Sequence, residues 1–136
     1  TRANIDQFGG DPNFVTIAGC SAGGHLAALA GLTADDPRLH PELPAGADTS
    51  VDAVVGIYGR YDWEDRSTIE RESFMSFLER VVVKKRYDRD PELYQTASPI
   101  ARVHCDAPPF LVVHGSADSL VTWPMATRPC HRYATA

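Results

Sequence analysis

The apolar residues of this chain are concentrated in three short runs that are apolar at nearly every position rather than at every second one. The runs cover residues 14–18, 51–58 and 109–113, and a glycine follows each of them closely. Continuous apolar character is typical of parallel strands that are buried on both faces. An Ala- and Leu-rich helix is predicted at residues 26–32, so the first two strands are expected to be joined by a right-handed crossover. The pattern predicts an α/β fold with a parallel-sheet core and flanking helices.

A second helix is predicted between the second and third strands. Residues 67–70 have the spacing of a capping box, and residues 84–86 place three cations where they suit the C-terminal end of a helix dipole. Between them, apolar side chains recur at helical spacing: Phe74, Phe77, Leu78 and Val81. This helix is expected to lie lid-like over the edge of a pocket, with its charges forming a solvated face rather than a binding patch. A short helical turn is predicted at residues 90–94, with Pro91 at its first position.

Charge and composition argue against a nucleic acid partner and against a transmembrane segment. The 136 residues include 13 basic and 18 acidic side chains, a net charge of −5, and the basic ones are scattered apart from residues 84–86. They form no stripe of the kind that binds a phosphate backbone, so no nucleic acid partner is expected. No apolar run approaches the ~20 residues of a transmembrane segment. The cysteines, Cys20, Cys105 and Cys130, are odd in number and lack C-x-x-C spacing, which indicates neither a disulfide framework nor a metal site.

The length and the first residue bear on the organisation of the chain. Its length suits one modest core. The sequence starts at Thr1, without a methionine or a hydrophobic leader, and is interpreted as a piece of a longer protein. Cytoplasm is the default compartment, and these residues define neither the compartment nor the oligomeric state.

The segment Gly19-Cys20-Ser21-Ala22-Gly23 joins the first strand to the first helix. It has the form G-x-S-x-G, in which a serine on a sharp strand-to-helix turn presents its hydroxyl at the carboxyl end of the strand. Side chains at Gly19 and Gly23 are expected to collide with neighbouring chain, which glycine avoids. The helix N-terminus points its dipole at the same place, so the backbone N–H of Ala22 is assigned to an oxyanion hole. Ser21 is therefore the predicted nucleophile of a serine hydrolase.

Several motifs resemble those of the α/β-hydrolase esterases and lipases, especially the carboxylesterase and BD-FAE-like branches. They are Phe8-Gly9-Gly10-Asp11-Pro12, Gly19 to Leu26, Tyr58-Gly59-Arg60-Tyr61-Asp62, Ser98-Pro99-Ile100 and Pro109 to Asp118. The resemblance implies a carboxylic ester hydrolase that acts on a small-molecule ester through a serine acyl-enzyme, with no cofactor. On this basis residues 1–121 are a partial α/β-hydrolase domain. Residues 122–136 depart from the family pattern and are interpreted as an atypical C-terminal tail.

Three aspartates are candidates for the acid of a catalytic triad. Asp118 follows the third strand in a glycine turn, at the edge where Ser21 is expected, and it is the predicted acid, with an Asx turn as its alternative role. Asp62, after the second strand, is the reserve candidate, although hydrogen bonding within its loop is the favoured role. Asp11 precedes a proline in a turn and is interpreted as an Asx cap.

Five further side chains near these motifs have structural interpretations beside functional ones. His25 is expected to be structural near the start of the helix, and the resemblance gives His114 a structural role in its turn. Cys20 is expected to be a buried apolar filler that touches neighbouring strands. Tyr61 and Trp63 either wall a substrate pocket or cover the core, and the sequence favours neither.

The catalytic base has no convincing candidate. The order in this fold is Ser, Asp, then His, and His131 is the only histidine after Asp118. Prolines break any helix that would lead to His131, so the base is expected beyond this sequence. The resemblance places a glycine-rich oxyanion loop upstream of Thr1.

Three functions remain open at this stage. The first is ester hydrolysis through Ser21. The second is peptide hydrolysis by a relative of the prolyl oligopeptidases, which have a similar elbow and a late aspartate. The third is a catalytically inactive remnant or binding module that keeps the fold without the chemistry.

Overall fold

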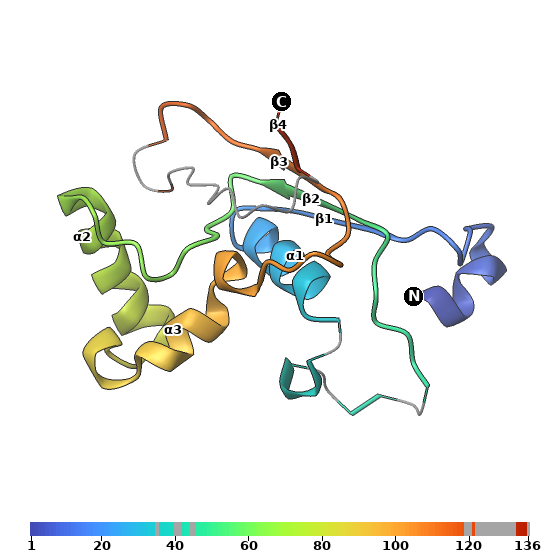
Figure 1. Ribbon diagram of the computed structural model, residues 1–136, viewed down its shortest axis with the longest axis horizontal. Coiled ribbons are helices and arrows are strands. Elements are labelled where there is room, and N and C mark those ends of the chain that lie inside the picture. Colours follow the sequence, from blue (N-terminus) through green and yellow to red (C-terminus); the bar gives the residue numbers. More distant parts are fainter. Residues whose placement is uncertain (35, 40–41, 44–45, 119–120, 122–132, 136) are drawn as a thin grey trace.

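The computed structural model describes residues 1–34, 36–39, 42–43, 46–118, 121 and 133–135. Its centre is a parallel sheet with the strand order β1-β2-β3-β4 (Figure 1). The strands are β1 (Thr16–Cys20), β2 (Ala53–Ile57), β3 (Phe110–Val113) and β4 (Tyr133–Thr135). The first three confirm the strands predicted from the apolar runs. The fourth was not predicted, because the residues around it have no strand-like pattern of their own.

The helices lie between the strands in the order expected of an α/β protein. They are α1 (Ala22–Leu32), α2 (Ile69–Leu78), which continues into the π-helical turn η3 (Glu79–Val83), and α3 (Pro91–Ala97). Short 3-10 turns cover Arg2–Phe8, Pro37–Leu39, Tyr87–Arg89 and Pro99–Arg102.

The caps of the second and third helices explain where these helices begin. The hydroxyl of Thr68 accepts a hydrogen bond from the N–H of Arg71, so α2 starts one residue later than the predicted capping box. The carboxylate of Asp90 accepts the N–H of Leu93 at 3.2 Å, and Pro91 takes the first helical position, as predicted.

The hydrophobic core lies between α1 and one face of the sheet. Its buried members are Ala27, Ala28 and Leu32 of α1, Val54 of β2, Phe110 and Val112 of β3, and Ala107. Alternate strand residues point to this face, so β1, β2 and β3 each contribute every second side chain. The small residues of α1 allow the helix to lie close to the sheet, which fixes the position of its N-terminus.

The opposite face of the sheet differs from the prediction. The strands were expected to be buried on both faces, but Leu111 and Val113 are exposed, and so is Ala18. In register, Ala18 lies opposite Val55 and Val55 opposite Leu111, so these apolar side chains form one continuous strip. The prediction was wrong for the described residues because α1 covers one side of the sheet only.

Residues 66–98, which contain α2, η3 and α3, form a helical arm. Figure 1 shows this arm beyond the edge of the sheet at which β1 and β2 end. Met75 of α2 and Tyr94 of α3 are fully buried, whereas Phe77 and Val81 are 54% and 50% exposed. The predicted apolar stripe is therefore only partly buried. Only one edge of α2 is buried, and the wider π-helical turn rotates the side chains that follow it away from that edge.

Candidate active site

Ser21 is the single residue between the end of β1 and the start of α1. Its backbone has φ 54° and ψ −120°, a conformation that residues with a side chain rarely adopt. The N–H of Ser21 donates to the carbonyl of Ile57 at 2.9 Å, and its carbonyl accepts the N–H of His25 at 3.1 Å. These bonds hold the turn from both sides, which is how a strained residue persists at a functional site. The residue is exposed at the carboxyl edge of the sheet.

The glycines around Ser21 have different structural requirements. A Cβ atom on Gly19 would lie 2.2 Å from the carbonyl oxygen of Gly23, so the predicted need for glycine is met there. A Cβ atom on Gly23 would meet nothing within 4 Å, so the predicted collision at that position was wrong. The second tight position is Gly24, where a Cβ atom would lie 2.9 Å from the carbonyl oxygen of Ile57. Gly24 lets the first turn of α1 approach the end of β2.

Alanine substitution of these glycines should separate the two behaviours. We expect Gly19→Ala and Gly24→Ala each to lower the free energy of unfolding by about 3 kcal/mol, because the clashing atoms belong to the backbone. Gly23→Ala should change it by less than about 1 kcal/mol, since alanine suits a helix better than glycine does. Chemical denaturation of the three variants measures this. Equal destabilisation at all three positions would contradict the geometry.

Asp118 lies in the turn that follows β3, at the same edge of the sheet. Its N–H donates to the carbonyl of Gly115 at 3.1 Å, and its Oδ1 accepts the N–H of Val121 at 2.9 Å. Its Oδ2 lies 3.3 Å from Nε2 of His114, a nearly buried side chain that also contacts the carbonyl of Val121. The local turn bonding that was the alternative interpretation of Asp118 is therefore present. His114 is part of this turn, in agreement with its expected structural role.

The strand order sets the separation between the two predicted catalytic groups. Ser21 follows β1 and Asp118 follows β3, with β2 between them. Two strand spacings are about 10 Å. An imidazole hydrogen-bonded at both nitrogens spans roughly 8 Å between its partners. The distance between the ends of β1 and β3 is therefore compatible with a histidine that bridges the side chains of Ser21 and Asp118.

The other two aspartates have local roles. Oδ1 of Asp62 accepts the N–H of Glu64 at 2.8 Å, which is the loop hydrogen bonding that was favoured over its reserve role. Oδ1 of Asp11 accepts both the N–H and the side-chain amide of Asn13, at 2.8 and 2.9 Å, as expected of an Asx cap.

His25 is buried and ties the start of α1 to the helical arm. Its Nε2 lies 2.8 Å from the carbonyl of Ala97, and because a carbonyl only accepts, this nitrogen carries the proton. The ring packs against Trp63 at a centroid distance of 5.0 Å. Burial lowers the pKa of His25 below its ordinary value. A neutral imidazole held in this way supports the structural role that was expected.

The lowered pKa of His25 predicts a dependence of stability on pH. The unfolded chain binds a proton at His25 near pH 6.5, whereas the folded protein resists doing so. The contribution of neutral His25 to the free energy of unfolding is therefore fully present above pH 6.5. As the pH decreases below that value, we expect the free energy of unfolding to decrease by up to about 1.4 kcal/mol per pH unit. Thermal unfolding between pH 7.5 and 5.5 should show this loss, and His25→Gln should reduce it.

Tyr61 and Trp63 take different positions after β2. Tyr61 packs against the core, and its hydroxyl lies beside Gly56. Trp63 lines a cavity of about 260 Å³ together with His25, Val83, Leu93, Tyr94 and Ala97. Of the two alternatives left open, covering the core therefore applies to Tyr61. Trp63 walls a cavity between α1 and the helical arm.

Two buried residues that the sequence did not single out hold the loop after β2. Oγ of Ser98 accepts the N–H of Trp63 at 2.8 Å and donates to the carbonyl of Tyr94 at 2.9 Å. The buried guanidinium of Arg60 donates to the carbonyl of Asp65 at 2.9 Å. The only signal for them in the sequence was their place in the motifs around Tyr58 and Ser98.

The cysteines differ from the prediction. Cys20 has a free, exposed thiol rather than a buried one, because β1 points it to the uncovered face of the sheet. A hydrogen bond between Cys20 and Tyr58 raises the pKa of the Tyr58 hydroxyl above its usual value. Cys105 is disulfide-bonded, which the odd number and the spacing of the cysteines did not indicate.

Some predictions fall outside the described residues. His40, Cys130, His131 and most of the predicted tail are among these positions. Within the described ranges, no group of three or more His, Cys, Asp or Glu side chains is arranged to hold a metal ion. None of the helices in the same ranges combines the length and apolar character that crossing a bilayer requires.

A parallel sheet with flanking helices and a strained serine at a strand-to-helix turn defines the α/β-hydrolase type of fold. The family model of BD-FAE matches residues 1–128, and the chain belongs to this family.

Similar proteins are named esterases. Esterase LipC of Mycobacterium tuberculosis is 69% identical over 120 residues, which are 88% of this chain and 30% of LipC. Esterase LipQ of the same organism is 50% identical, over 88% of this chain and 28% of LipQ. A solved structure described as a truncated form of a carbohydrate esterase from gut microbiota is 31% identical with a TM-score of 0.65, over 88% of this chain and 46% of that one. The chain thus spans under a third of the length of these mycobacterial relatives.

Proposed function

We propose that the protein hydrolyses carboxylic esters through an acyl-enzyme on Ser21. The observation that carries the proposal is the backbone of Ser21, which is strained and exposed between β1 and α1. A strained serine at this point presents its hydroxyl to a substrate at the sheet edge. The esterase names of LipC and LipQ support the same reaction class.

The proposed reaction has two stages. A histidine base takes the proton of the Ser21 hydroxyl as its oxygen attacks the ester carbonyl. The resulting oxyanion accepts the N–H of Ala22 at the positive end of the α1 dipole. Collapse of this intermediate releases the alcohol, which takes the proton back from the imidazolium. Water then attacks the acyl-serine, with the same base accepting its proton. Collapse of the second intermediate breaks the acyl–oxygen bond, returns that proton to the Ser21 oxygen and releases the carboxylic acid.

Asp118 is the proposed partner of that histidine. Its carboxylate would accept the Nδ1–H of the imidazole, which fixes the tautomer that can take the serine proton. One carboxylate oxygen is already oriented by the N–H of Val121. The histidine itself and a second oxyanion donor are expected outside the described residues.

The proposed substrate is a small-molecule ester. Two tests on the full-length protein separate it from the alternatives. The first compares turnover of p-nitrophenyl acetate and butyrate with turnover of aminoacyl-proline p-nitroanilides. We expect turnover of the esters. Turnover of the amides instead would indicate the prolyl-oligopeptidase-like alternative.

The second test is covalent labelling by a fluorophosphonate probe. We expect stoichiometric labelling of the native protein, located at Ser21 by peptide mapping. A protein with a cooperative thermal transition that neither reacts with the probe nor turns over esters would be an inactive relative with a binding role.

A further inference from the structure

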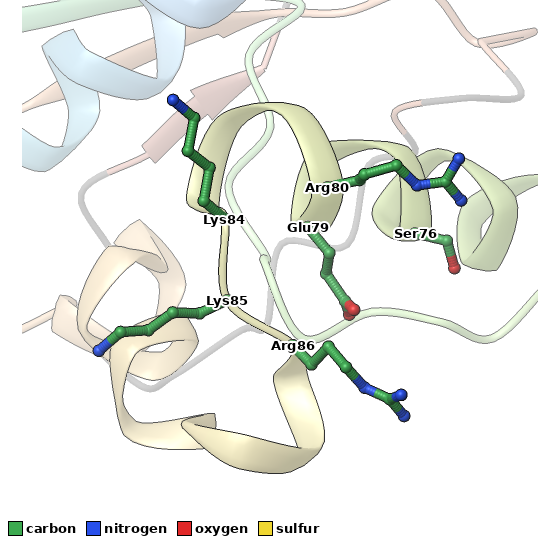
Figure 2. Close-up of a pocket in the computed structure, with 6 residues that line it drawn as sticks. All are labelled: Ser76, Glu79, Arg80, Lys84, Lys85 and Arg86. Carbon is green, nitrogen blue, oxygen red and sulfur yellow. The ribbon is translucent and has the colours of Figure 1, made fainter.

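The tip of the helical arm combines cationic and apolar side chains at the surface. The tip comprises Arg80, Lys84, Lys85 and Arg86 together with Phe77, Val81 and Val82. Figure 2 shows the side chain of Arg80 extending from η3 and those of Lys84, Lys85 and Arg86 from the segment that follows, with Glu79 between the two arginines. Together with Ser76 and Glu79, the four cationic side chains line an open hollow of about 600 Å³, and the three apolar residues are all exposed.

The tip has a charge opposite to that of the rest of the chain. Residues 77–86 contain four basic side chains and one acidic one, Glu79, whereas the remainder has nine basic and 17 acidic side chains. The carboxylate of Glu79 pairs with Arg66, outside the tip, at 2.5 Å. Among the described residues, no carboxylate forms an ion pair with Arg80 or Lys84. The tip is therefore a local positive site on an acidic chain.

The two remaining cations are engaged only in surface ion pairs. Lys85 pairs with Asp90 and Arg86 with Asp88, both at 2.8 Å, and both cationic side chains are largely exposed. Exposed pairs of this kind contribute little, so a phosphate group can replace the carboxylate at small cost. All four cations are thus accessible to an anionic surface.

The exposed apolar residues favour a membrane, which has an apolar interior, over a soluble anion as the ligand of the tip. Phe77 and Val81 are four residues apart on the helix and therefore neighbours, and Arg80 directly precedes Val81 in the sequence. Apolar side chains next to cations are typical of segments that bind at a membrane interface. There the cations meet lipid phosphates and the apolar groups enter the acyl boundary.

We propose that the tip of the helical arm docks the protein on anionic phospholipid membranes. This inference is independent of the proposed chemistry at Ser21.

Co-sedimentation of the full-length protein with lipid vesicles tests the proposal. We expect binding to mixed phosphatidylcholine and phosphatidylglycerol vesicles at low salt, weaker binding at high salt, and little binding to phosphatidylcholine alone. Arg80→Gln/Lys84→Gln should weaken binding roughly 30-fold. Phe77→Ser/Val81→Ser should weaken it about tenfold.

Matched controls lie at the opposite end of the molecule. Ala3→Glu/Gln7→Glu adds the same change in charge on the exposed N-terminal turn, and Phe8→Ser removes a side chain that is 82% exposed. Both should bind like the unmodified protein, and so should Ser21→Ala, which separates this proposal from the proposed chemistry. Absence of vesicle binding, or equal losses in the tip variants and the controls, would overturn it. If the unmodified protein does not bind vesicles and the tip variants have lower melting temperatures, the tip is covered by other parts of the protein, and the proposal is wrong.

Discussion

Ser21→Ala is expected to lower kcat for p-nitrophenyl butyrate hydrolysis by roughly 10⁶-fold and to leave KM within a few-fold of its original value. The variant loses the oxygen that would form the proposed acyl-enzyme but keeps the N-terminus of α1. Substrate binding should therefore survive while the chemistry does not. Steady-state kinetics on the full-length protein measures both constants, and fluorophosphonate labelling should disappear in parallel.

Ser73→Ala is the matched control for this substitution, because Ser73 is an exposed serine on α2. It should retain full activity and labelling. If Ser21→Ala folds normally and still hydrolyses the ester, the proposed acyl-enzyme mechanism is wrong, even though the fold is unchanged.

The strand-to-helix turn at Ser21 was predictable because its determinants are local. The run from Phe14 to Ala18 predicts a strand, and the Ala- and Leu-rich residues after Gly24 predict a helix. Few conformations connect these elements within so short a segment. The caps of α2 and α3 were also predicted, the first to within one residue, since a capping side chain acts on its own turn.

The misses depend on contacts between distant segments. The tight glycine is Gly24 rather than Gly23 because the carbonyl of Ile57, on another strand, approaches that position. The exposure of Cys20 depends on which face of the sheet α1 covers, and periodicity does not define that choice. The same reason applies to α2, where Met75 rather than Phe77 is buried. A residue pattern predicts elements well, but it predicts their docked faces poorly.

Asp118→Asn is expected to lower kcat by about 10⁴-fold, because an amide stabilises the wrong imidazole tautomer and does not stabilise the imidazolium. The substitution isolates charge from structure. The asparagine oxygen can still accept the N–H of Val121, which Oδ1 of Asp118 accepts at 2.9 Å, whereas its amide group loses the contact of Oδ2 with Nε2 of His114 at 3.3 Å. We therefore expect a modest decrease in the melting temperature beside the large loss of kcat. Comparison of kcat with the melting temperature separates a role in the reaction from a role in the turn.

Asp62→Asn is the matched control, since its Oδ1 likewise accepts a backbone N–H, from Glu64 at 2.8 Å. We expect Asp62→Asn to stay within about threefold of the original kcat, because hydrogen bonding inside a loop does not require the negative charge. The reverse result, a large loss in Asp62→Asn and none in Asp118→Asn, would move the acid to the end of β2. A bridging histidine would then have only one strand spacing to cross, about 5 Å, and the triad geometry proposed across β1 and β3 would be wrong.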